Sequence, residues 1–219
     1  MLLIRIDPKR PDAAALKKAA AVLKSGGLVV YPTETAYALG CDPKSAKAVK
    51  RLFSVKKRDM SKPLPMIAAS VAMAKRFLKL DRYASALAAA FWPGPLTLVA
   101  PVKKLHVRIF AGAKKMHDRK MRADAALRVS PHSVASALSK ALGRPIVSTS
   151  ANRSGMATSY DVPSVLADLG TMPDLVLDAG TLKKAPVSTI VRPSGGVMEI
   201  LREGAVTEDD LHRALMKIL

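Results

Sequence analysis

Cysteine is nearly absent from this chain of 219 residues, in which Cys41 stands alone. A single cysteine excludes an intrachain disulfide and a zinc site built from several cysteines, and it is typical of a reducing compartment. Long apolar runs are also missing, since no stretch approaches the about 18 residues that span a bilayer. Residues 1–11 carry no apolar region of a signal peptide. These absences predict a soluble, cytoplasmic protein without membrane contact.

Acidic residues are scarce as well: 17 Asp and Glu stand against 36 Lys and Arg, which gives a net charge of +19. With 49% apolar residues, a chain of this length buries a core without disulfides or metals. The excess positive charge argues for anionic partners such as nucleic acid or nucleotides, although a solvated charged surface is the alternative. Two basic clusters, at residues 44–62 and 103–122, hold eight Lys and Arg each, with one Asp apiece.

The common catalytic motifs do not occur. The sequence contains no G-x-x-x-x-G-K-[ST], G-x-G-x-x-G, G-x-S-x-G or H-E-x-x-H. Its four histidines have no metal-ligand spacing, and Cys41 has no nearby histidine that would activate a thiolate. A hydrolytic triad and a metalloenzyme are therefore excluded as interpretations, and Cys41 is expected to be a small buried residue.

Helical and strand patterns alternate along the chain, which predicts one α/β domain with a mixed sheet. Pro65 places its strand at an edge or a bulge, and the basic segment 103–122 reads as a loop or a partial helix. A Thr207–Asp210 capping box is expected to open the last helix. The expected helices are 12–25, 45–53, 70–78, 83–91, 132–142, 165–169 and 207–218. The expected strands are 28–31, 64–68, 96–100, 126–129, 146–149, 175–177, 188–191 and 198–202.

Two clusters of polar side chains suggest a ligand site. Thr33 and Thr35 follow a strand directly, where open α/β sheets bind ligands. The alternative is a proline turn whose hydroxyls bond their own backbone. Lys56 and Arg58 are two residues apart, so an extended backbone would let both grip one phosphate chain. A solvated run of charge is the alternative here.

Two further clusters complete the picture. Ser148–Asn152 carries four polar side chains after an apolar strand and could form a donor-rich pocket wall, although an ordinary Ser/Thr loop looks similar. Ser188 and Thr189 open one strand, and Arg202 closes another. Taken together, the four clusters describe a crevice suited to anions.

These segments resemble the motifs of the YrdC/YciO family, whose characterised enzymes are threonylcarbamoyl-AMP synthases in tRNA modification. The resemblance runs from residue 26 to residue 204, and it is specific because several unrelated motifs occur in the right order. Ser130 stands where the fourth motif has proline. The motifs are Pro32–Tyr37 (P-T-E-T-x-Y), Lys56–Arg58 (K-x-R), Trp92–Thr97 (W-P-G-P-L-T), Arg128–His132 (R-[VM]-P-x-H), Thr149–Gly155 (T-S-A-N-x-S-G), Ser188–Ile190 (S-T-[IV]) and Leu201–Gly204 (L-R-x-G).

The resemblance implies a single twisted α/β domain over 1–219, with a core of about 12–206 and a concave, positive sheet surface like that of double-stranded-RNA-binding proteins. It implies the short form of the family, without the extra C-terminal domain. It also implies a nucleotidyltransferase that makes L-threonylcarbamoyl-AMP and pyrophosphate from L-threonine, bicarbonate or CO2, and ATP with Mg2+. A downstream threonylcarbamoyl transferase complex would then modify tRNA.

Roles for individual residues follow from the same resemblance. Lys56 and Arg58 would act on the phosphates as the catalytic cations. No acidic cluster marks a metal cage, so Mg2+ would be held mostly by phosphates and water. The threonine-binding residues would be Thr33, Thr35, Arg128 and Ser188, with Arg128 as a fork on the carboxylate. The nucleotide-binding residues would be Lys56, Arg58, Ser148, Ser150, Asn152, Thr158 and Arg202.

Besides Ser130, three positions depart from the family pattern. Ala38 replaces a glycine, Ile67 replaces a histidine found in some members, and Asp124 would set a carboxylate near the phosphates unless it turns outward or meets Mg2+. The basic segment 103–122 is also longer than usual. These departures keep open a non-catalytic, YciO-like paralogue that binds tRNA or double-stranded RNA through its basic face. A third reading is a nucleotide-binding module of a larger assembly.

Overall fold

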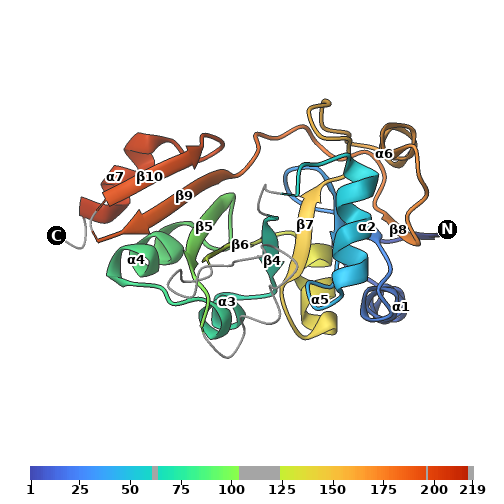
Figure 1. Ribbon diagram of the computed structural model, residues 1–219, viewed down its shortest axis with the longest axis horizontal. Helices are drawn as coiled ribbons and strands as arrows, with labels where there is room; N and C mark the ends of the chain where they lie inside the picture. The colour runs from blue at the N-terminus through green and yellow to red at the C-terminus, as the bar shows by residue number, and fades with distance from the viewer. Residues whose placement is uncertain (61–63, 104–123, 196, 217–219) are drawn as a thin grey trace.

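The computed structural model describes residues 1–60, 64–103, 124–195 and 197–216. Within these ranges the strands form one mixed, ten-stranded sheet in the order β1-β8-β2-β3-β7-β4-β6-β5-β9-β10. The sheet runs from the β1/β8 edge, near the N-terminus, to the β9–β10 hairpin at the other end (Figure 1). The strands are β1 (Leu2–Arg5), β2 (Val29–Pro32), β3 (Tyr37–Cys41), β4 (Met66–Ala68), β5 (Leu96–Pro101), β6 (Asp124–Val129), β7 (Ile146–Ser150), β8 (Leu175–Asp178), β9 (Thr189–Ser194) and β10 (Val197–Arg202).

Seven helices flank this sheet in the described part of the chain, and most begin where a side chain caps the first turn. Asp12, Ser45, Ser70, Asp81 and Asp161 each accept a hydrogen bond from the backbone N–H three residues on. The expected capping box is confirmed, since the Asp210 N–H donates to the Thr207 hydroxyl. The helices are α1 (Ala13–Lys24), α2 (Ala46–Lys56), α3 (Val71–Phe77), α4 (Arg82–Phe91), α5 (Ser133–Leu142), α6 (Val162–Leu169) and α7 (Glu208–Met216).

The two faces of the sheet are covered unequally. One face packs its apolar side chains against α2, α3, α4, α6 and α7. On the other face, α1 and α5 pack on residues of β8, β2, β3, β4 and β7. That second core cluster holds no described residue of β6, β5, β9 or β10. In the second half of the sheet, no helix of the described residues therefore packs on this face, which we call the open face, and Arg128 and Thr97 lie on it.

The α/β fold with a mixed sheet and flanking helices is as predicted, but several elements differ. β1 and β3 were not expected. α2 continues to Lys56 instead of ending at residue 53, and α6 begins at Val162. β4 is an interior strand between β7 and β6, so the edge or bulge inferred from Pro65 is wrong. Pro65 precedes the strand, where it loses no ladder bond, and its carbonyl accepts from the Ser148 N–H at 2.8 Å.

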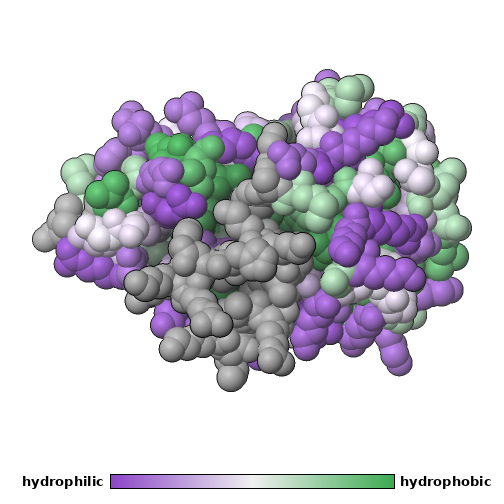
Figure 2. Space-filling view, viewed as in Figure 1, coloured by the Kyte–Doolittle hydropathy of each residue, from purple (hydrophilic) through white to green (hydrophobic). Residues whose placement is uncertain are grey.

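The sheet and helices extend on both sides of the expected core of 12–206, because β1 pairs with β8 and Leu211 of α7 is buried. Lys47 and Lys50 of α2 are exposed, as is Lys44 just before the helix, whereas Lys56 at its end is buried. Figure 2 shows the hydrophilic surface around this helix. The segment 104–123, which carries most of the second basic cluster, lies outside the described residues. Among the described residues, no helix has both the length and the apolarity to cross a membrane.

Candidate functional site

The turn between β2 and β3 holds the two threonines of the first motif in different ways. Thr33 is buried, and its hydroxyl donates to the Ala36 carbonyl at 2.6 Å and accepts from the Ala36 N–H at 3.2 Å. Both bonds of this hydroxyl stay within the turn, in agreement with the alternative of a proline turn whose hydroxyls bond their own backbone. Thr35 is half-buried, and its hydroxyl lies 3.1 Å from that of Thr33. Thr35 is the residue of this turn that can offer a hydroxyl to a ligand.

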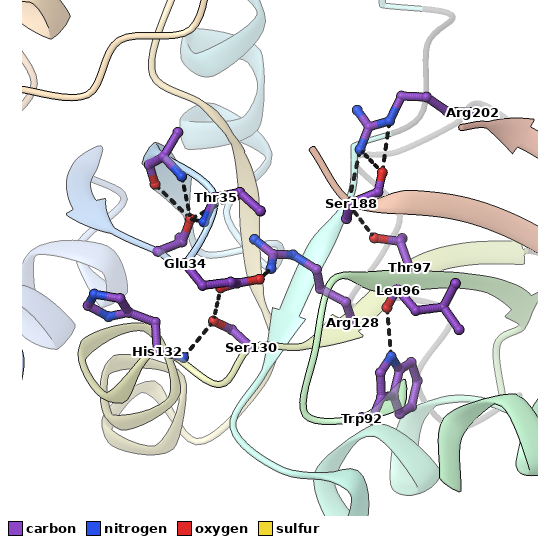
Figure 3. Close-up of polar contacts among 12 residues, drawn as sticks. Glu34, Thr35, Trp92, Leu96, Thr97, Arg128, Ser130, His132, Ser188 and Arg202 are labelled. Atoms are coloured by element: carbon purple, nitrogen blue, oxygen red, sulfur yellow. Dashed lines mark hydrogen bonds and ion pairs between the residues drawn. The ribbon is translucent and has the colours of Figure 1, made fainter. Parts of the chain in front are cut away.

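Arg128 is buried on β6, at the open face of the sheet. It is paired with a carboxylate, that of Glu34, from the turn between β2 and β3. Its Nη1 forms an ion pair with Glu34 Oε1, and Glu34 Oε2 accepts from the Ser130 hydroxyl at 2.5 Å (Figure 3). Burial, and to a lesser degree the charge of Arg202, lowers the pKa of Arg128 to about 10. Arg128 is therefore still a cation at neutral pH.

Ser188 and Arg202 form a second polar group across the close-up in Figure 3. Arg202 donates from Nε at 3.1 Å and from Nη2 at 2.6 Å to the Ser188 carbonyl. Its Nη2 also lies 3.0 Å from the Ser188 hydroxyl, which is 3.0 Å from the hydroxyl of Thr97. The guanidinium thus fixes the chain directly before β9.

Gly204 makes this second group possible because a side chain there would collide with the same backbone. A Cβ at Gly204 would lie 2.3 Å from the Val187 carbonyl oxygen and 2.7 Å from the Ser188 carbonyl carbon. Gly94 has a matching role in the W-P-G-P motif, since its N–H donates to the Val129 carbonyl next to Arg128. A Cβ at Gly94 would lie 2.3 Å from the Phe91 carbonyl oxygen.

Lys56 is buried under the Ser150–Asn152 loop, with 1% of its surface exposed. Its Nζ donates to the carbonyl oxygens of Ser150 and Asn152, at 2.5 and 2.6 Å, and lies 3.4 Å from Asn152 Oδ1. The Asn152 amide nitrogen donates to the carbonyls of Met156 and Ala157, and its oxygen accepts from the Ser150 hydroxyl. Lys56 and Asn152 thus hold the loop together from inside, and half-buried Thr158 follows it.

The K-x-R segment does not have the extended backbone that would let both cations grip one phosphate chain. Lys56 is the last residue of α2, and Lys57 caps the helix in the left-handed region with a φ of 47°. The turn sends Lys56 into the core while Arg58 stays half-buried. Because α2 runs one turn further than its apolar pattern indicated, the two cations reach the site at different depths.

The four expected cations are nevertheless electrostatic neighbours. The charge of Arg58 lowers the pKa of Lys56 and of Arg202, and the charge of Arg202 lowers the pKa of Arg128, in each case as an addition to the effect of burial. Burial is the main cause for Lys56, whose pKa falls to about 8. Positive charge from three separate segments thus converges, which favours a ligand with several negative charges.

The remaining expected residues line or support this region. Ser148 is buried on β7, and its hydroxyl faces Tyr31, the burial of which raises the pKa of the phenol. Ala38 is an ordinary strand residue between Tyr31 and Ser150, without positive φ. Ile67 is buried and pairs with Arg128 in the β4–β6 ladder.

Asp124 does turn outward. It is exposed and lies 3.7 Å from Arg192 Nε, while Arg192 Nη1 donates to Glu199 at 2.6 Å. The sequence reasoning missed Glu34, Ser130 and Thr97 as contributors to the site. Glu34 and Thr97 lie inside family motifs, and Ser130 departs from one. No spacing signal shows that Glu34 meets Arg128 and Ser130, or that Thr97 meets Ser188.

Comparison with known proteins agrees with this arrangement. The family model for the Sua5, YciO and YrdC proteins, described as "Telomere recombination", matches residues 21–204. This chain belongs to that family. A threonylcarbamoyl-AMP synthase of Alkalilimnicola ehrlichii is 37% identical over 179 residues, which cover 82% of this chain and 88% of that protein. The Halorhodospira halophila protein of the same name is 39% identical over 163 residues, covering 74% and 81%.

Two solved structures share the fold. The crystal structure of P. abyssi Sua5 complexed with L-threonine has a TM-score of 0.85 and 29% identity. It matches 98% of this chain, and the match spans 61% of the Sua5 chain. The crystal structure of E. coli YciO has a TM-score of 0.80 at 24% identity, with 94% and 97% of the two chains covered, and supports the fold alone.

Proposed function

We propose that this protein is an L-threonylcarbamoyladenylate synthase, a nucleotidyltransferase that forms threonylcarbamoyl-AMP and pyrophosphate from L-threonine, bicarbonate or CO2, and ATP. The observation that supports the proposal is the convergence of Lys56, Arg58, Arg128 and Arg202 near the turn between β2 and β3 that carries Thr33 and Thr35. The curated relatives in this family are named for this activity. The same relatives identify the chain as an enzyme.

The geometry suits this reaction because its ligands are anionic. The amine of threonine and CO2 form a carbamate, whose oxygen attacks the α-phosphorus of ATP while pyrophosphate leaves. The nucleophile already carries a negative charge, so the site needs cations and positioning more than a buried base. Arg128 is assigned to the threonine carboxylate, with Thr35 and Ser188 beside it and Thr33 shaping the turn.

The nucleotide is assigned to the other side of the site. Arg58 and Arg202 would hold the phosphates directly. Lys56 and Asn152 would act by setting the shape of the Ser150–Asn152 loop, with Ser148 and Thr158 lining it. Among the described residues no group of three or more His, Cys, Asp or Glu side chains could hold a metal ion. Mg2+ is therefore assigned to ATP, with its remaining ligands from phosphate oxygens and water.

The partners follow from the product. Threonylcarbamoyl-AMP is a reactive mixed anhydride, so a threonylcarbamoyl transferase complex that acts on tRNA is the expected consumer, and we place both in the cytoplasm. Direct binding of tRNA or double-stranded RNA to the basic face is a secondary hypothesis. The curated names favour the synthase over a non-catalytic paralogue, and the ordinary strand geometry of Ala38 and the outward turn of Asp124 remove two reasons for the paralogue.

The test is a reconstituted reaction. Purified protein receives ATP, Mg2+, bicarbonate and L-threonine, and pyrophosphate and threonylcarbamoyl-AMP are measured with threonine present or omitted. We expect turnover that depends on threonine, and a loss of most activity in Arg58→Ala. Lys50→Ala, an exposed lysine of α2, is the matched control that leaves turnover unchanged. A folded wild type without threonine-dependent pyrophosphate release would contradict the proposal.

A further inference from the structure

Glu34 spends both of its carboxylate oxygens inside the protein. Oε1 is ion-paired with Arg128, and Oε2 accepts from Ser130 at 2.5 Å. The Glu34 side chain is 18% exposed and that of Arg128 is 10% exposed, so the pair is shielded from bulk water at the edge of the open face. A buried guanidinium requires an anion, because an unpaired buried charge is costly. In the ligand-free protein, Glu34 is that anion.

The position of Arg128 does not depend on this pairing alone. Arg128 lies on β6, an interior strand between β4 and β5, where it pairs with Ile67. The sheet therefore fixes its backbone. A ligand carboxylate that binds Arg128 must compete with Glu34, which already pairs with the guanidinium. Two carboxylates beside one cation repel each other.

Ser130 is what holds Glu34 in this place. Its hydroxyl donates to Glu34 and accepts from the His132 N–H at 3.1 Å, so it bridges the turn between β2 and β3 and the loop before α5. The family motif carries proline at this position, and proline has no hydroxyl that could do the same. In this chain, Ser130 therefore ties Glu34 to the loop before α5.

We propose that Glu34 is an internal carboxylate that occupies the carboxylate subsite of Arg128 in the ligand-free protein, and that Ser130 secures it there. An amino-acid ligand binds by displacing Glu34 from Arg128, so the pair sets the affinity for that ligand. The identity of the amino acid as L-threonine rests on the proposed function, whereas the occupation of Arg128 by Glu34 does not.

The first test compares affinities for L-threonine by isothermal titration calorimetry. Removing the negative charge in Glu34→Gln removes the competitor, so we expect about tenfold tighter binding. Ser130→Ala, which keeps Glu34 but loses its anchor, should shift the affinity in the same direction by a few fold. Glu199→Gln removes a carboxylate from the exposed Arg192 pair and should leave the affinity unchanged. Affinity for ATP should not change in any of the three variants.

Equal or weaker threonine binding in Glu34→Gln would overturn the proposal, because it would make Glu34 a support for Arg128 and not a competitor. Binding in none of the proteins, wild type included, would contradict the proposed function. The second test then decides the role of Glu34 without using threonine.

The second test is rescue by a small carboxylate. Glu34→Ala empties the subsite, so sodium acetate should raise its melting temperature by several degrees more than sodium chloride at equal ionic strength does. Wild type and Glu199→Ala should respond equally to both salts. No acetate-specific stabilisation of Glu34→Ala would overturn the proposal. If Glu34→Ala does not fold, Ser130→Ala is measured in its place, and it should respond to acetate weakly but above wild type.

Discussion

The ammonium of Lys56 donates to the carbonyl oxygen of Ser150 at 2.5 Å, across 94 residues of sequence. Two oxygens of Asn152 surround the same nitrogen, so its three donors face three acceptors. A lysine that looked like a phosphate-binding side chain is therefore the internal support of a loop. Lys56 affects the nucleotide site in two ways: it sets the position of that loop, and its charge interacts with that of Arg58.

Lys56→Met should unfold the Ser150–Asn152 loop. Methionine fills a similar volume but removes the ammonium donor from the carbonyls of Ser150 and Asn152, while Asn152 Oδ1 keeps its bond from the Ser150 hydroxyl. Hydrogen bonds from a charged donor are worth about 1.5–3 kcal/mol each. We expect the free energy of unfolding in urea to fall by about 3 kcal/mol, together with a loss of ATP binding. Lys47→Met, at an exposed position of the same helix, is the control and should change neither quantity. A Lys56→Met protein as stable as wild type would contradict the supporting role.

The same lysine predicts a pH dependence of stability. Burial lowers the pKa of Lys56 to about 8 from its ordinary value of 10.5. Between these two values the unfolded chain binds more protons than the folded one, so the stability contributed at this site rises with pH across that interval. The difference in free energy of unfolding between wild type and Lys56→Met should therefore grow from pH 8 to pH 10. Parallel pH curves for the two proteins would contradict the lowered pKa.

The sequence predicted the fold class and most helices because their signals are local. Capping residues such as Ser45 and Asp161, and apolar spacing along each helix, need no knowledge of distant contacts. β3 was missed because every one of its residues is buried, so Tyr37–Cys41 shows no alternation. Its identity as a strand comes from pairing with β2 and β7, which lies outside any local window.

The candidate site divides in the same way. The motif segments were located correctly, since each carries its own polar pattern. The partners within the site were not predicted, because Glu34 meets Ser130 and Lys56 meets Asn152 across 96 residues in both cases. A buried lysine is also rare, so a lysine in a basic run is reasonably expected on the surface. Only the tertiary fold reverses that expectation.

Asp124→Asn should leave catalysis unchanged. The carboxylate is exposed and lies 3.7 Å from Arg192, so it neither repels the phosphates nor takes part in binding them. Exposed ion pairs contribute about 0–1 kcal/mol, and stability should change by no more than that. We expect KM for ATP and kcat within twofold of wild type, measured by pyrophosphate release. A large fall in KM for ATP would instead mean that Asp124 faces the nucleotide.

Gly204→Ala should damage the second polar group while leaving its side chains intact. The added Cβ would lie 2.3 Å from the Val187 carbonyl oxygen, a backbone atom that cannot rotate away, so β9 must shift at Ser188. We expect a loss of about 2–3 kcal/mol in the free energy of unfolding, in the range of overpacked sites, and weaker binding of both threonine and ATP.

Gly195→Ala is the matched control in the β9–β10 turn. Its Cβ meets nothing within 4 Å, and its φ of 59° adds about 1–2 kcal/mol of left-handed strain without touching Ser188. If both variants lower stability but only Gly204→Ala weakens ligand binding, the glycine of the L-R-x-G motif is required for the position of Ser188. Equal ligand affinities in the two variants would contradict that role.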